Sequence, residues 1–323
     1  MSDKFIFQNA RIKSMESRLL GQQQLQRLTE AASVRDFQKI LAESGFGASA
    51  SGDNVSADRL IEAEEKAAAA LLREFNVDGA LDAFLLVYDY HNLKALLKAT
   101  VTGAKSPVLG AEGLFDVEKL KEGAEGDYTS LRPLMAEAVR SVEKSVAEGR
   151  VTPHGIDCTV DKAMFRDIVA VAQKGGQAVA GYFVFKADCA NLAAFFRCRK
   201  QGLSERLFRE NFVDGGSLDE EFFLSSFEMP TEVFRDKCKF TPYRVLAEKA
   251  CDEGLIAFEV AADNALLAYW KKDRDDMFSC APVVGFYLGK LADIKAVKLV
   301  FAGIKNRVEP ALIKERMRDI YGA

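Results

Sequence analysis

Histidine is almost missing from this chain of 323 residues, which contains only His91 and His154. We interpret His91 as a residue on a helix surface and place His154, which follows Pro153, in a turn. Neither is expected to ligate a metal or to activate a cysteine nucleophile, because no set of ligand or nucleophile residues accompanies it. The sequence therefore predicts no metal site.

Phosphate-binding loops are also missing. The chain has no Gly-x-x-x-x-Gly-Lys-Ser/Thr segment, which is the loop that holds the phosphates in many nucleotide hydrolases. The isolated pairs Gly175-Gly176 and Gly215-Gly216 are better explained as helix ends or turns, because glycine tolerates a positive φ. We expect no catalytic residue and no cofactor-binding residue. If the chain acts in ATP hydrolysis, another protein of the same complex must hold the nucleotide.

Long apolar runs and paired cysteines are absent as well. A bilayer-spanning helix needs about 20 mainly apolar residues, but the most apolar run, from 178 to 185, is followed by Lys186 and Asp188. The six cysteines form no Cys-x-x-Cys pair and no secretory leader opens the sequence, which favours free thiols in a reducing cytoplasm. We expect a protein that would work at a membrane only from the water side.

The net charge of −4 gives no general attraction to nucleic acid. Positive charge is concentrated locally: the stretch from Pro282 to the C-terminus has eight Lys or Arg and four Asp or Glu. A second basic cluster is a candidate interface and consists of Arg197, Arg199, Lys200, Arg206 and Arg209. It is either a solvated helical face or a basic rim that meets anionic headgroups or polar loops of a partner.

Apolar residues at spacings of three and four predominate, which predicts an all-α protein. The stretch from Arg11 to Leu28 is expected to form one amphipathic helix, and the small polar residues from Gly45 to Asn54 a loop. A strongly helical segment is expected from Ala57 to Phe75.

An internal repeat is the most informative pattern. An aspartate is followed by apolar residues at +4, +7 and +8 in three places, 99 and 105 residues apart. The copies begin Asp89-x-x-Asn92, Asp188-x-x-Asn191 and Asp293-x-x-Ala296. These polar residues are interpreted as structural, bonding free backbone groups at a helix start or kink; a chance likeness between amphipathic helices is the alternative. The repeat predicts three similar helical domains over 1–112, 113–224 and 225–323.

Three segments resemble one known family. Gln8 to Leu20 (QNARIKSMESRLL), Tyr88 to Lys94 (YDYHNLK) and Phe212 to Leu218 (FVDGGSL) are similar to motifs of the C subunit of prokaryotic V-type ATPases and of its eukaryotic relative, the d subunit. The likeness extends from about residue 5 to the C-terminus. It departs from the family pattern near Lys290 to Lys298, where the family often has an acidic cluster followed by Asn-Ile-Arg.

The resemblance implies a funnel of three helical domains around a pseudo-threefold axis. It implies a non-catalytic rotor subunit of the central stalk, located at the cytoplasmic face of a membrane and peripheral to it. The partners would be the central-axle subunits of the soluble ATPase sector and the membrane proteolipid ring, with H⁺ or Na⁺ transport coupled to ATP hydrolysis or synthesis. Two alternatives stay open: a free-standing helical scaffold that binds proteins on a concave face, and a helical enzyme that uses the cysteines and carboxylates.

Overall fold

The computed structural model describes residues 3–50 and 55–321, and these residues form helices, turns and connecting segments with no β-strand. The prediction of an all-α protein is confirmed. The chain forms two compact units: Met1–Val77 with Ile256–Ala323, and Asp78–Leu255. The division into three similar domains, and their arrangement as a funnel, stay predictions.

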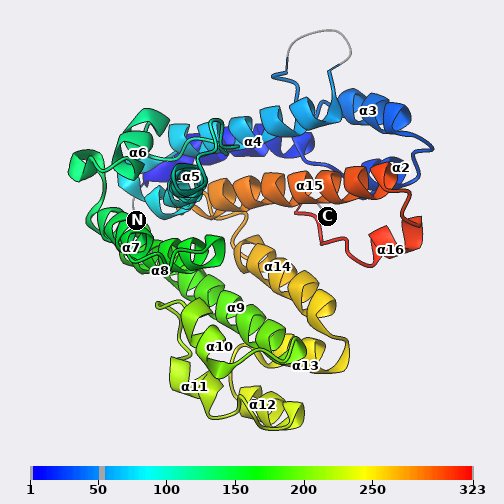
Figure 1. Cartoon of the computed structure of the whole chain (residues 1–323). Helices are drawn as coiled ribbons and strands as arrows, with labels where there is room; N and C mark the ends of the chain where they lie inside the picture. Colours follow the sequence, from blue (N-terminus) through cyan, green and yellow to red (C-terminus); the bar gives the residue numbers. More distant parts are fainter. Residues whose placement is uncertain (1–2, 51–54, 322–323) are drawn as a thin grey trace. The chain divides into compact units, whose positions relative to one another are not determined.

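The first unit contains both ends of the chain (Figure 1). Its helices are α1 (Ile6–Met15), α2 (Gln22–Thr29), α3 (Val34–Glu43), α4 (Ala57–Glu74), α14 (Leu255–Lys271, whose first residue belongs to the other unit), α15 (Ala281–Lys305) and α16 (Pro310–Lys314). Short 3₁₀ helices cover Asp3–Phe5 and Glu16–Arg18.

The second unit is built from consecutive helices. These are α5 (Asp82–Thr102), α6 (Val117–Ala124), α7 (Pro133–Ala147), α8 (Pro153–Ala172), α9 (Gln177–Lys200), α10 (Glu205–Asn211), α11 (Glu220–Leu224), α12 (Thr231–Cys238) and α13 (Arg244–Asp252). Short 3₁₀ helices cover Val77–Gly79, which begins one residue before this unit, Tyr128–Ser130 and Gln173–Gly175.

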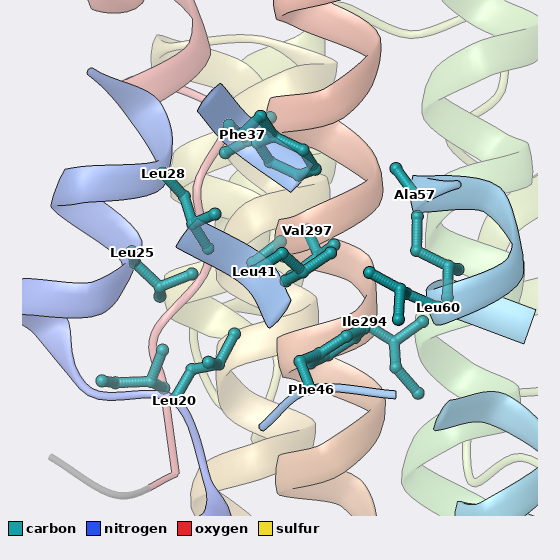
Figure 2. Packing of buried hydrophobic residues seen from close by; sticks show 14 of the residues in the cluster. Leu20, Leu25, Leu28, Phe37, Leu41, Phe46, Ala57, Leu60, Ile294 and Val297 are labelled. Atoms are coloured by element: carbon teal, nitrogen blue, oxygen red, sulfur yellow. The ribbon is translucent and has the colours of Figure 1, made fainter. Parts of the chain in front are cut away.

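Helix α15 is the centre of the first unit. It runs beside α4, and α2 and α3 pack against it although they lie near the opposite end of the sequence (Figure 1). Figure 2 shows Ile294 and Val297 of α15 among Leu28, Phe37 and Leu41 from these helices. Burial of these side chains is the main stabilisation of the unit, at about 1.5 to 3 kcal/mol for each large apolar residue.

Helix α9 contributes many buried side chains to the core of the second unit. It is long and apolar enough to cross a membrane, but 61% of that apolar window is buried inside the protein. Phe195 contacts several phenylalanine rings of the following helices, and its ring centroid lies 4.1 Å from that of Phe234. With Asp188 and Asn191 buried in its middle, α9 has the character of a core helix.

The expected single helix from Arg11 to Leu28 is wrong. The chain leaves α1 at Met15, forms one 3₁₀ turn and extends at Leu19 before α2 begins at Gln22. Apolar spacing cannot reveal this break, because Leu19 and Leu20 within it are buried like the residues of the flanking helices. The cause is tertiary: a distant carboxylate binds the backbone at Leu20. The helix expected over 57–75 is confirmed as α4.

Candidate functional site

Asp89 is fully buried in the middle of α5 and binds the backbone of the loop that leads into α6. Its Oδ2 accepts the Leu114 N–H at 2.8 Å, and its Oδ1 accepts the Phe115 N–H at 3.2 Å. We call a buried repeat aspartate together with the backbone N–H groups that it binds a latch, and this is the first latch. Because both oxygens accept hydrogen bonds, the buried charge is compensated.

Asp188 forms the second latch from the middle of α9. Its Oδ2 accepts the Ser217 N–H at 2.8 Å and the Ser217 hydroxyl at 2.7 Å, and its Oδ1 accepts the Leu218 N–H at 3.0 Å. The buried Tyr243 hydroxyl also donates to Oδ2, and the Tyr243 ring stacks on Phe185. Burial, followed by the hydrogen bond to the carboxylate, raises the pKa of this phenol far above its usual range, so it stays a donor.

Asp293 forms the third latch from the middle of α15, but only one of its two carboxyl oxygens accepts a hydrogen bond from the described residues. Its Oδ2 accepts the Leu20 N–H at 2.9 Å, across 273 residues of sequence. Its Oδ1 is buried and has no hydrogen-bond partner within residues 3–50 and 55–321. Burial raises the pKa of the Asp293 carboxyl to about 7, against the opposing effects of the Leu20 N–H and Lys290.

All three latches bind the backbone immediately before a short helix. The amides at Leu114 and Phe115 precede the N-cap Asp116 of α6, and those at Ser217 and Leu218 precede the N-cap Asp219 of α11. Leu20 precedes Gly21, the N-cap residue of α2. The repeat aspartates lie inside helices, not at the helix start or kink that the sequence suggested. The free backbone groups belong to loops.

The two repeat asparagines extend the same anchoring. Asn92 accepts from the Gly110 N–H at 2.7 Å and donates to the Ala111 carbonyl at 3.0 Å. Asn191 does both with the single residue Val213, each at 2.9 Å. Ala296 replaces this asparagine in α15 and lies in the apolar core shared with α2 and α3. An amide there would have to be buried among apolar side chains, which is costly without partners.

Two glycines allow the loops to approach the aspartates. A Cβ added to Gly113 would lie 2.5 Å from the Asp89 carboxyl carbon, and one added to Gly216 would lie 2.1 Å from the Asp188 Oδ1. Any larger residue would push the loop away from its carboxylate. Gly216 was assigned to a turn from the sequence, but its close contact with Asp188 is visible only in the structure.

A charged cluster lies beside the third latch. The side chains of Lys290 and Glu64 are 12% and 9% exposed, and Lys290 Nζ lies 2.7 Å from Glu64 Oε1. Lys290 also donates to the Arg18 carbonyl at 2.8 Å, while Glu64 Oε2 accepts the Gly47 N–H at 2.8 Å. Both ion-pair partners line a cavity of about 590 Å³ in the first unit, with Phe286 also in its wall. The repeat pattern gave no signal for Glu64.

A partly buried charge pair joins helices of the second unit. Arg132, at the N-cap of α7, donates to both oxygens of Asp167 in α8 at 2.6 and 2.7 Å. The Tyr90 hydroxyl of α5 donates to the same carboxylate at 3.0 Å. This network was missed in the sequence, because the two donors lie 35 and 77 residues from Asp167 and follow no shared spacing.

Asn9, inside the N-terminal family motif, is also structural. It is fully buried, and its amide donates to the carbonyl groups of Met277 at 2.9 Å and Ser279 at 2.8 Å. Arg11 of the same motif lies over the Phe75 ring and pairs with Glu74. The motif therefore holds α1 to distant parts of its own unit.

The candidate basic cluster is divided between structural and exposed residues. Arg199 donates to the Met229 carbonyl at 2.5 Å and lies 5.4 Å from the Phe195 ring centroid. Arg197 and Lys200 are exposed near the C-terminal end of α9. Lys200 is therefore better placed than Arg199 to meet a partner.

The remaining two arginines of the cluster are paired with acids. Arg206 lies 3.0 Å from Glu210, and Arg209 lies 2.7 Å from Glu205 and 2.9 Å from Glu220. Such exposed pairs contribute little to stability, because water screens the two charges. They reduce the local positive charge that the sequence suggested.

The two histidines have different surroundings. His91 is exposed on α5, as expected, whereas His154 lies in the first turn of α8 and not in a free turn. His154 Nε2 is 3.4 Å from the Cys158 sulfur, a contact that the sequence interpretation did not anticipate. Burial raises the pKa of the Cys158 thiol, which is the opposite of the activation that a nucleophilic cysteine needs.

Comparison with known proteins decides the family. The profile of the ATP synthase (C/AC39) subunit family matches residues 8–316. The chain belongs to this family. The three latches and Asn9 therefore lie in the part of the chain that this family shares, and the resemblance inferred from the three motifs is confirmed.

Relatives within the C/AC39 family cover most of the chain. The C subunit of the V-type ATP synthase of Thermus thermophilus is 26% identical over 314 residues, which is 93% of each chain. The C subunit of the A-type ATP synthase of Thermococcus kodakarensis is 21% identical over 98% of this chain and 91% of its own. The C subunit of the V-type sodium ATPase of Enterococcus hirae is 23% identical over 74% of each chain.

Proposed function

We propose that this member of the C/AC39 family is a non-catalytic rotor component of a V/A-type ATPase or ATP synthase, which seats the central axle on the membrane proteolipid ring. The family match over residues 8–316 carries this proposal. The protein would transmit torque and thereby couple ATP hydrolysis or synthesis to H⁺ or Na⁺ transport. It would lie peripherally at the cytoplasmic face of the membrane.

The latches suit a mechanical role. Each holds the middle of a long helix to a loop through a buried aspartate, so that the helix cannot move without breaking hydrogen bonds to the loop backbone. Removing one partner of such a buried group costs about 1 to 3 kcal/mol or more. A body built in this way resists local deformation, as torque transmission requires.

The contact with the axle or ring is proposed to use the exposed basic residues at the end of α9. Arg197 and Lys200 lie there, and long-range attraction to acidic or headgroup partners would orient the protein during assembly. The second candidate function is a free-standing helical scaffold that binds protein partners on a concave face.

Co-purification with the remaining complex tests the proposal. The tagged chain is mixed with axle subunits and with the detergent-solubilised ring, and ion pumping is measured in complexes that lack or contain it. We expect the chain to bridge axle and ring, and its removal to abolish coupled pumping while the soluble sector still hydrolyses ATP. Binding to neither component would contradict the rotor role and favour the scaffold.

A further inference from the structure

The third latch differs from the other two in one backbone bond. In the first and second latches the two residues before the N-cap both donate to the aspartate. In the third, Leu20 donates to Asp293, but the preceding Leu19 N–H bonds to the Glu16 carbonyl at 3.1 Å. The 3₁₀ turn at Glu16–Arg18 thus takes up the amide that would otherwise satisfy Asp293 Oδ1.

The charge around Asp293 is also unbalanced. Glu64 of α4 and Asp293 of α15 are both buried carboxyl groups, and Lys290 is the ammonium group that acts on both. Lys290 is already engaged by Glu64 and by the Arg18 carbonyl. One ammonium cannot neutralise two buried carboxylates, so the ionised cluster would carry an uncompensated negative charge in a low-dielectric site.

Other ionisable groups packed around this site do not supply the missing positive charge. The Tyr321 phenol of the C-terminal segment is buried against Gly285 and Gly289, and burial raises its pKa to about 12, so it is neutral. Arg18 of the 3₁₀ turn lines the same cavity as Lys290 and Glu64, but it is exposed, so water screens its charge; its neighbour Glu16 is half-buried. The ionisable residues of α2, α3 and α16 lie on exposed faces: Arg27, Arg35, Asp36, Lys39, Glu43 and Lys314.

We propose that the Asp293 carboxyl is a proton-binding site, and that loss of its proton loosens the connector 18–21 between α1 and α2. The proton resides on Oδ1, since Oδ2 accepts the Leu20 N–H in either state. When it leaves, Lys290 is drawn towards two carboxylates, and its bond to the Arg18 carbonyl weakens. The cavity that Lys290 and Glu64 line gives water a route to the cluster.

The sign of the pH effect follows from linkage. The ordinary pKa of aspartate is about 3.9, and that of Asp293 in the folded chain is about 7. The folded chain therefore binds more protons than the unfolded chain between these values, and its free energy of unfolding falls as the pH rises through that window. Opening of the connector depends on pH in the same way, because the Asp293 carboxyl becomes solvated when the connector opens and its pKa then falls towards the ordinary value.

Hydrogen exchange of the intact chain tests the proposal. Peptides covering 18–21 are followed by mass spectrometry at about pH 6 and pH 8, after correction for the intrinsic rate of amide exchange. For a carboxyl whose pKa falls on opening, we expect the protection of this connector to decrease about tenfold over that range. Asp293→Asn cannot ionise, so its protection should be independent of pH.

Two further variants separate this mechanism from a general loss of stability. Glu64→Gln keeps an acceptor for Gly47 but removes one carboxylate, so the midpoint of the pH response should move to lower pH. Asp89→Asn is the matched control. In this variant the side-chain NH₂ group would face a backbone N–H that donates to the carboxylate in the wild type, so the fold is destabilised. The pH response of the connector should nevertheless be unchanged. An unchanged response in Asp293→Asn, or equal protection of the wild type at both pH values, would overturn the proposal.

Discussion

At the residue scale, the three repeat aspartates differ in the number of backbone N–H groups that they bind. Asp89 and Asp188 each bind two consecutive backbone N–H groups, whereas Asp293 binds one. Hydrogen bonds to a carboxylate favour its charged form, and burial without them favours the neutral form. The same residue type at the same repeat position therefore has different chemistry in α15.

The glycine beside the second latch should be intolerant of a side chain. In Gly216→Ala the new Cβ would lie 2.1 Å from Asp188 Oδ1, so the loop must move and stretch its bonds to the carboxylate. We expect a loss of about 1 to 3 kcal/mol in the free energy of unfolding, measured by urea denaturation. Gly110→Ala is the control, because its Cβ meets nothing closer than 3.5 Å; equal losses in both variants would contradict this view.

At the scale of elements, the long helices α5, α9 and α15 share one design. Each is apolar over most of its surface and carries a single buried aspartate near its middle. Helices that are apolar all round belong to a core, and the aspartate specifies which loop covers them. The short helices α6, α11 and α2 follow these loops and begin where the bound backbone ends.

Truncation of a core residue tests the contribution of α9. Leu192 is fully buried next to the second latch, so Leu192→Ala removes apolar contacts and leaves a cavity. We expect a loss of about 2 to 4 kcal/mol, measured by chemical denaturation. Leu312→Ala provides the comparison: this leucine of α16 is 51% exposed, and a change above about 0.5 kcal/mol there would show that burial does not govern the difference.

At the scale of the whole molecule, the two compact units divide the latches between them. The first and second latches lie in Asp78–Leu255, and the third lies in the unit formed by both ends of the chain. The third latch closes this unit by joining α15 to the connector before α2. The third latch can therefore form only after α15, near the C-terminal end of the chain, has been synthesised and packs against the N-terminal segment.

Assembly should depend on the exposed charge at the end of α9. We expect Lys200→Glu to weaken binding to the partner complex severalfold at low salt and much less at high salt, because exposed charges are screened within about 10 Å at 0.1 M salt. Capture assays at two salt concentrations measure this effect. Lys119→Glu changes an exposed lysine on α6; the same loss in both variants would indicate a nonspecific effect of net charge.

Some of the candidate site could be predicted without coordinates. The spacing of apolar residues predicts an all-α protein, and the repeat identifies Asp89, Asp188 and Asp293 as equivalent. Arg199 and Arg209 were assigned with their neighbours to one basic cluster, although Arg199 is held by the Met229 carbonyl and Arg209 by two glutamates. Charge along a sequence does not show which side chains share a partner.

The sequence by itself determined the helical class, the family and the positions of the repeated aspartates, because these follow from local periodicity and from motifs of adjacent residues. Only the tertiary structure decided what the aspartates bind. The backbone donors lie 25 to 30 residues after the aspartate in the first two latches but 273 residues before it in the third. No local pattern encodes such a separation. The long separation in the third latch arises because burial of apolar side chains brings α15 beside the N-terminal helices. There the Leu19 N–H is already bonded to the Glu16 carbonyl, so that of these two neighbouring amides only the Leu20 N–H binds Asp293.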